Sequence, residues 1–179
     1  GLETYQKILA EAMEELGVET GISTRGNGES FVADCTIETD QQALIPDSYI
    51  DVTAEKMRVY KQMDSIMNEK DLDRFKSQMV DRFGKMPEEL ENLFYVVKVR
   101  NMGSKLGFEK IIIKNGMFIA FFINNQMSPY YKSSTFDSVI KKIVENESLL
   151  NLKQSEGRLK IVARGIDSME KAYGLIRKL

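Results

Sequence analysis

The residue types available for catalysis are few, because the chain has no histidine and a single cysteine, Cys35. The usual general base and the commonest metal ligand are therefore missing. Carboxylates offer three close pairs: Asp71 with Asp73, Glu88 with Glu89, and Glu145 with Glu147. The pattern predicts a solvated helix surface for each pair. A small hydrolase that uses paired carboxylates is the least favoured hypothesis.

Cofactor chemistry has little support in the sequence. A phosphate-binding loop needs closely spaced glycines followed by a GKS or GKT triplet. The one glycine cluster, Gly21, Gly26 and Gly28, has no such triplet. With one cysteine, no internal disulfide is possible, and Cys35 is predicted to be a buried apolar residue in a reducing compartment. We therefore expect no cofactor and no metal.

Nucleic-acid binding is the alternative function that the sequence leaves open. Phosphate contacts and base stacking use a basic run and an aromatic–basic cluster. These are Lys98, Arg100, Lys105, Lys110 and Lys114, and then Tyr130, Tyr131 and Lys132. The net charge of −2 and the pI of about 5.4 argue against a dedicated binder.

Two adjacent charges, Asp81 and Arg82, stand just before a predicted helix end at Gly84. Pro87 is typical of the first turn of the next helix. In one interpretation the two charges lie on a solvated last turn, where Arg82 interacts favourably with the helix dipole. In the other, they point away from an apolar stripe and bind another protein by charge pairing.

The elements that position these residues follow from periodicity. Helical spacing over residues 2–16 predicts a helix, and the glycine-rich residues 17–30 predict a flexible linker. Alternation predicts a strand over 31–39. One helix is predicted from an N-cap at Thr53 to about residue 67. A second is predicted to follow an Asn68 cap and to end at Gly84 in a left-handed conformation, and a third to run from Pro87 to Gly107.

The second half of the chain changes to strand period. Asn115-Gly116 between two apolar runs predicts a type I′ hairpin, with the runs III and MFIAFFI covered on both faces for much of their length. A helix is expected to open at Ser134 or Thr135, and a second hairpin is expected around Glu156-Gly157. Asp167 is expected to cap a last helix. The sequence thus predicts an α+β fold in which helical hairpins pack with a small, largely antiparallel sheet built from β-hairpins.

Hydrophobic residues make up 42% of the 179 residues, enough for one core, which we place at residues 31–179. No apolar run approaches the roughly 20 residues that cross a membrane, so we expect no membrane contact and a cytoplasmic protein.

Four stretches resemble the C-terminal domain of bacterial transcription-repair coupling factors, the Mfd family. They are LIPDSYI (44–50), RVYKQM (58–63), DLDRFKSQMVDRFGKMPEEL (71–90) and NLFYVVKVRNMGSKLG (92–107). The first residues are similar to the segment that leaves the helicase motor of that family. The resemblance implies a TRCF-type regulatory domain at 31–179, preceded by the motor-exit helix at 1–16 and a linker at 17–30.

The resemblance also implies a function. The family is an ATP-dependent DNA translocase that displaces stalled RNA polymerase and recruits excision repair. Its C-terminal domain is non-catalytic, docks on the N-terminal UvrB-like module, masks UvrA binding and restrains the motor. RNA polymerase, UvrA and duplex DNA would be reached through the parent protein. By matching positions, Asp81 and Arg82 fall in the interdomain contact, and Gln78 stands where relatives can have an acid.

Overall fold

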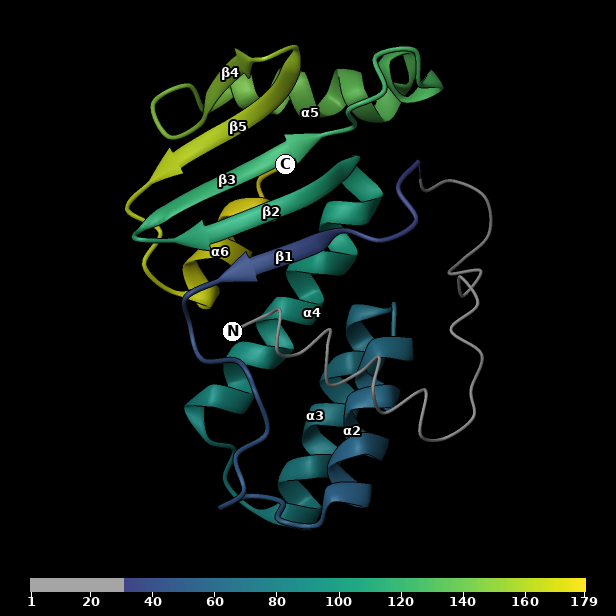
Figure 1. Cartoon of the computed structure of the whole chain (residues 1–179), viewed down its shortest axis with the longest axis vertical. Helices are drawn as coiled ribbons and strands as arrows, with labels where there is room; N and C mark the ends of the chain where they lie inside the picture. The colour runs from purple at the N-terminus through teal and green to yellow at the C-terminus, as the bar shows by residue number, and fades with distance from the viewer. Residues whose placement is uncertain (1–30) are drawn as a thin grey trace.

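The computed structural model describes residues 31–179 and contains a five-stranded sheet with helices on one side and below it (Figure 1). The predicted helix at 2–16 and linker at 17–30 lie outside the described residues. The elements in chain order are β1 (Thr36–Thr39), α2 (Thr53–Ser65), α3 (Glu69–Phe83), α4 (Glu88–Leu106), β2 (Phe108–Lys114), β3 (Met117–Phe122), the 3-10 helix η1 (Pro129–Lys132), α5 (Ser134–Glu145), β4 (Asn151–Ser155), β5 (Arg158–Arg164) and α6 (Met169–Ile176).

The strand order is β1-β2-β3-β5-β4, and only the β1–β2 pair is parallel. Both predicted hairpins are present. Asn115 and Gly116 have φ values of 54° and 73°, and Glu156 and Gly157 have 54° and 75°. A type I′ turn needs positive φ at both central residues, which is why Asn-Gly favours it. The prediction of an α+β fold with a largely antiparallel sheet is confirmed.

One face of the sheet is covered by α4 and α6, which lie behind it in Figure 1. Residues that point to this side, such as Ile111 and Phe118, are fully buried, whereas their neighbours Ile112 and Ile119 are only half-buried. The prediction that these apolar strands are covered on both faces is therefore wrong within residues 31–179. Side chains on the other face still pack against their cross-strand neighbours. This packing favours aliphatic residues there even though no described helix covers them.

The helices α2 and α3 lie side by side below the sheet, and α4 runs from them up behind it (Figure 1). Asn68 caps α3 as predicted, since its side-chain oxygen accepts the backbone N–H groups of Lys70 and Asp71. Thr53 is the first residue of α2 and not its cap, which is Val52 without a side-chain hydrogen bond. Pro87 is the cap of α4, one position before the predicted start.

Two further boundaries differ from prediction. The strand expected over 31–39 begins only at Thr36, because β2 first pairs with it at Lys110. Before that point the chain has other partners, and the backbone N–H of Cys35 donates to Ser104 Oγ at 3.1 Å. The last helix is capped by Ser168, whose Oγ accepts from Lys171 N, and not by Asp167. The Asp167 carboxylate instead pairs with the Lys171 ammonium at 2.8 Å.

The C-terminal half of α4 packs very closely on Cys35, the residue before β1. A Cβ at Gly103 would lie 2.9 Å from Cys35 Sγ, so only glycine allows this approach. Cys35 is fully buried, as predicted. Burial raises the pKa of its thiol, which keeps the sulfur protonated and unreactive.

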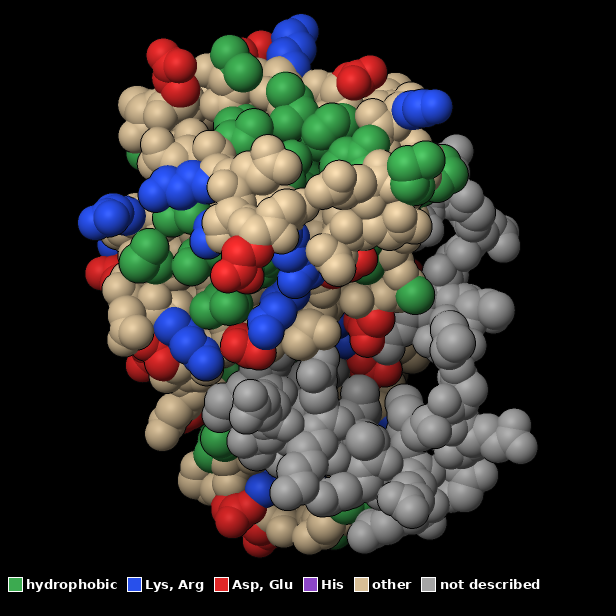
Figure 2. All heavy atoms as spheres, turned by 45° about the horizontal axis from the view of Figure 1, so that its top comes forward, with side chains coloured by type: hydrophobic (Ala, Val, Ile, Leu, Met, Phe, Trp, Pro, Cys, Tyr) green, Lys and Arg blue, Asp and Glu red, His purple; other side chains and the backbone are tan. Residues whose placement is uncertain are grey.

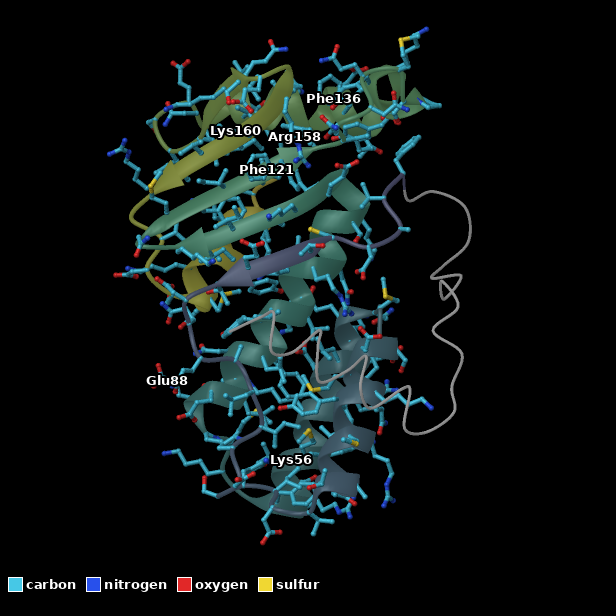
Figure 3. The ribbon with its side chains drawn as sticks, viewed as in Figure 1. Lys56, Glu88, Phe121, Phe136, Arg158 and Lys160 are labelled. Carbon is cyan, nitrogen blue, oxygen red and sulfur yellow. The ribbon has the colours of Figure 1, made fainter. Side chains whose placement is uncertain are left out.

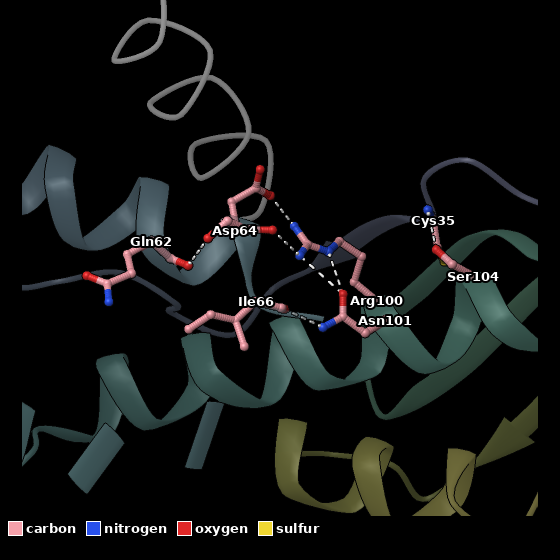
Figure 4. A network of polar contacts seen from close by, with 8 residues as sticks. Cys35, Gln62, Asp64, Ile66, Arg100, Asn101 and Ser104 are labelled. Carbon is pink, nitrogen blue, oxygen red and sulfur yellow. Dashed lines mark hydrogen bonds and ion pairs between the residues drawn. The ribbon is translucent and has the colours of Figure 1, made fainter. Parts of the chain in front are cut away.

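A buried polar network joins α2 to α4 (Figure 4). Arg100 donates from Nη1 to the Asp64 carboxylate and from Nη2 to the Asp64 carbonyl oxygen at 3.2 Å. Asn101 donates from Nδ2 to the carbonyl of Ile66 at 3.0 Å. Arg100 and Asp64 are 4% and 5% exposed. The ion pair thus fixes the end of α2 against α4 from inside the protein.

Candidate functional site: the exposed end of helix α3

Helix α3 turns one face to the core and the other to solvent. Its buried residues, Leu72, Phe75 and Met79, recur at helical spacing, and the Phe75 ring lies 6.2 Å from that of Phe94 on α4. Gln78, Asp81 and Arg82 are all exposed. Asp81 and Arg82 lie three and four residues after Gln78, so each is a surface neighbour of Gln78 on the same side of the helix. The sequence-predicted contact residues therefore form one continuous polar face.

The C-terminus of α3 is held by contacts from a distant segment. Gly84 has φ 90° and ψ −164°, so the expected positive φ is present, but the backbone is extended and not left-handed helical. The Tyr49 hydroxyl donates to the Gly84 carbonyl at 2.8 Å, and its ring lies 5.7 Å from that of Phe83. The loop that carries LIPDSYI thus fixes the point where the polar face ends.

Arg82 is already engaged within the domain. Its Nη1 lies 2.8 Å from Glu55 Oε1 on α2, and its guanidinium lies 4.7 Å from the centre of the Phe83 ring. The side chain of Arg82 remains 66% exposed, whereas that of Glu55 is 17% exposed. Asp81 and Gln78 form no side-chain hydrogen bond or ion pair with any other residue of 31–179. Among the described residues, the polar face therefore presents one unpaired carboxylate beside a guanidinium that is paired with Glu55 but still largely exposed.

Sequence reasoning missed Glu55. It lies on α2, far along the chain from Arg82, and it also approaches Arg58 Nη2 at 3.8 Å. No local spacing links Glu55 to Arg82, so no sequence signal could have found the pair. Only the packing of α2 against α3 brings them together.

The basic residues proposed for nucleic-acid binding do not form one surface. Arg100 is buried against Asp64. Lys98 lies 2.8 Å from Asp73, and Tyr130 is fully buried with its hydroxyl donating to the Leu106 carbonyl. Burial raises the pKa of the Tyr130 hydroxyl. Lys110 and Lys114 lie on β2, where both pair with Glu38. Their side-chain hydrogen bonds and charge lower the pKa of Glu38.

The carboxylate pairs also separate. Asp73 pairs with Lys98, whereas Asp71 pairs with Arg74.

A hollow of about 590 Å³ between α5 and β4 is lined mainly by aliphatic side chains, and Glu147 is its only acid. Within residues 31–179, no group of three His, Cys, Asp or Glu side chains is placed to hold a metal ion. In the same residues, no helix combines the length and apolar character needed to cross a membrane.

Fold and surface together define a small α+β domain whose candidate site is a polar helix face. A TRCF domain family model matches residues 39–133. The chain therefore belongs to the TRCF domain family, the C-terminal domain of transcription-repair coupling factors.

Individual relatives agree with this assignment. The transcription-repair-coupling factor of Rickettsia typhi is 33% identical over 129 residues, which cover 72% of this chain and 11% of that protein. The Escherichia coli protein is 26% identical over 135 residues, again covering 72% and 11%. A crystal structure of the C-terminal domain of transcription-repair coupling factor superposes with a TM-score of 0.62 at 16% identity, covering 80% of this chain and 91% of the other. The chain spans about a tenth of the length of the curated relatives it matches.

Proposed function

We propose that this domain is the non-catalytic regulator of a transcription-repair coupling factor, an ATP-dependent DNA translocase that displaces stalled RNA polymerase and recruits excision repair. In the resting protein the domain docks on the N-terminal UvrB-like module, masks the UvrA-binding surface and restrains the motor. Gln78, Asp81 and Arg82 form the contact. The observation that carries this proposal is their shared exposure on α3, where the Asp81 carboxylate pairs with no other side chain of the described residues.

The energetics of this face suit a contact that must open. An exposed ion pair contributes only about 0.2–1 kcal/mol. Two or three such contacts hold a domain in place without making the closed state permanent. A partner that binds the open state, such as RNA polymerase, then shifts the equilibrium by its differential affinity.

The fold holds the docking residues of α3 in a fixed position. The α3 helix is capped at Asn68, and its end is fixed by Tyr49 through the Gly84 carbonyl. Arg82 is held in place by Glu55 and by the Phe83 ring, which limits the rotamer entropy that docking must remove. A carboxylate on the UvrB-like module could then pair with the exposed part of the guanidinium while Glu55 keeps its own contact.

Charge reversal of Arg82 tests the proposal. Arg82→Glu in the full-length parent is expected to raise both UvrA binding and basal ATPase activity. It removes the guanidinium from the docking contact and places an acid beside Glu55. A loss of about 1–2 kcal/mol from the closed state corresponds to a 5- to 30-fold change in its population ratio. Asp81→Arg is expected to act in the same direction. UvrA binding is measured by titration, and ATPase activity is measured without RNA polymerase.

The matched control is Lys178→Glu, which makes the same charge change at an exposed position after α6. It should leave UvrA binding and ATPase activity unchanged. The 179-residue chain with Arg82→Glu should stay folded with its free energy of unfolding lowered by only about 1 kcal/mol, because the side chain at position 82 is 66% exposed and solvent screens its charge from Glu55. If UvrA binding and ATPase activity of the Arg82→Glu and Asp81→Arg parents equal those of the unchanged protein, this docking contact is ruled out.

A further inference from the structure

A second surface lies on the face of the sheet that no described helix covers, here called the open sheet face. The register places Lys110, Phe121, Lys160 and Lys153 in one row across β2, β3, β5 and β4. The next row begins with Ile112, Ile119 and Val162, and a third contains Lys114, Met117 and Arg164. A central aliphatic row is thus flanked by two rows rich in basic residues. Figure 2 shows Lys and Arg side chains interspersed with hydrophobic ones over the sheet.

The open sheet face is strongly basic although the whole chain has a net charge of −2. To the five basic residues of these rows β5 adds Arg158, and the only acids are Glu38 on β1 and Glu109 on β2, so six minus two gives +4. Glu38 pairs with Lys110 and Lys114, and Glu109 pairs with Arg158. Lys153, Lys160 and Arg164 have no acidic partner within residues 31–179. The uncompensated charge is therefore concentrated on β4 and β5.

An aromatic ring lies among these cations. The Arg158 guanidinium is 4.8 Å from the centre of the Phe121 ring, and Lys160 Nζ is 5.9 Å from it. Figure 3 shows the three residues next to one another on the near side of the sheet. Bases of single-stranded nucleic acids stack on aromatic rings and on guanidinium planes, while Lys and Arg contact their phosphates. Phe121 with Arg158 offers the stack, and Lys153, Lys160 and Arg164 offer the phosphate contacts.

We propose that the open sheet face binds single-stranded nucleic acid. Strands lie about 4.8 Å apart, so the row from Lys110 to Lys153 spans roughly 14 Å. The four-stranded sheet of RNA-recognition domains, which has a similar width, stacks two or three bases. Phe121 lies between Lys110 and Lys160 in this row. An aromatic ring between two cations suits a single strand, which has both phosphates and bases that stack, better than it suits an acidic protein segment. Within residues 31–179 no helix lies on this face (Figure 1), so the face offers no recognition helix to the major groove of a duplex.

This surface differs from the one that the sequence indicated. Of the basic and aromatic residues that the sequence suggested for nucleic-acid binding, only Lys110 and Lys114 belong to the open sheet face. The others are buried, lie on helices or are paired elsewhere. The proposal is independent of the docking contact on α3, since the two surfaces share no residue.

The test is fluorescence anisotropy of the full 179-residue chain with labelled oligothymidine and oligouridine of about ten nucleotides. Binding is expected at low salt, with a slope of log K against log[salt] of about −2, since each phosphate contact on a single strand contributes about −0.7. The variant Lys153→Gln/Lys160→Gln/Arg164→Gln should lose most of this slope. Phe121→Leu should weaken binding about tenfold with the slope unchanged, because stacking contributes about 1–3 kcal/mol per base. The two oligonucleotides separate DNA from RNA.

The matched control removes three exposed lysines outside the sheet, Lys70→Gln/Lys85→Gln/Lys178→Gln, and should keep affinity within about twofold. The proposal is overturned if both triple variants lose affinity equally, or if no binding occurs at low salt. It is also overturned if a duplex of the same length, or polyglutamate at equal charge, competes as well as the single strand. The last result would identify a surface for acidic proteins.

Discussion

Asp64→Ala is expected to lower the free energy of unfolding of this domain by about 3–5 kcal/mol, the cost of leaving a buried charge without its partner. Arg100 is 4% exposed and donates both to the Asp64 carboxylate and to its carbonyl oxygen. The alanine variant keeps the carbonyl but removes the carboxylate that pairs with the buried guanidinium. Urea unfolding followed by circular dichroism gives the change from the midpoint and slope.

Two controls separate pairing from general damage. Asp64→Leu with Arg100→Met removes both charges at similar volume, and is expected to be much less destabilising than Asp64→Ala alone, because replacing a whole buried pair is often neutral. Asp167→Ala breaks the exposed Asp167–Lys171 pair of 2.8 Å and should leave the free energy of unfolding nearly unchanged, because solvent screens this pair. A loss below 1 kcal/mol for Asp64→Ala would contradict the view that this pair fixes α2 on α4.

Gly107→Ala is expected to destabilise the domain by about 2–5 kcal/mol. Gly107 has φ +95°, and a Cβ there would lie 2.2 Å from ring carbons of Tyr130, which is fully buried. The left-handed conformation costs an L-residue about 1–2 kcal/mol, and overpacking a filled core adds about 1–3 kcal/mol. Tyr130 cannot simply move, because its ring packs against Phe31, Phe122, Tyr131 and Phe136. Thermal and urea unfolding both measure the loss.

Gly116→Ala is the matched control for the backbone term. Gly116 also has positive φ, +73°, but no atom lies within 4 Å of a Cβ built on it. The expected cost is about 1–2 kcal/mol, from conformation alone. The difference between the two variants measures the contact with Tyr130. Equal losses would mean that the ring moves aside at little cost.

The sequence by itself determined the parts of this protein that depend on near neighbours in the chain. Asn68 caps α3, and Asn115-Gly116 turns the hairpin between β2 and β3. Gly107 ends α4 with a left-handed conformation. Each of these depends on a backbone preference or a hydrogen bond within a few residues, so the local residue types suffice. The change from helical to strand period gave the α+β class for the same reason.

Only the tertiary structure decided which charges are available. Arg100, Lys98 and Lys110 are basic residues that the sequence does not distinguish. In the structure Arg100 is buried in an ion pair, Lys98 contacts Asp73 on α3, and Lys110 lies on a sheet face. Arg82 meets Glu55 because α2 packs against α3. The open sheet face depends on register, which brings Phe121 beside Lys160 and Lys110. Charge pairing between distant segments has no local signature, because it is set by how the apolar faces pack and not by spacing along the chain.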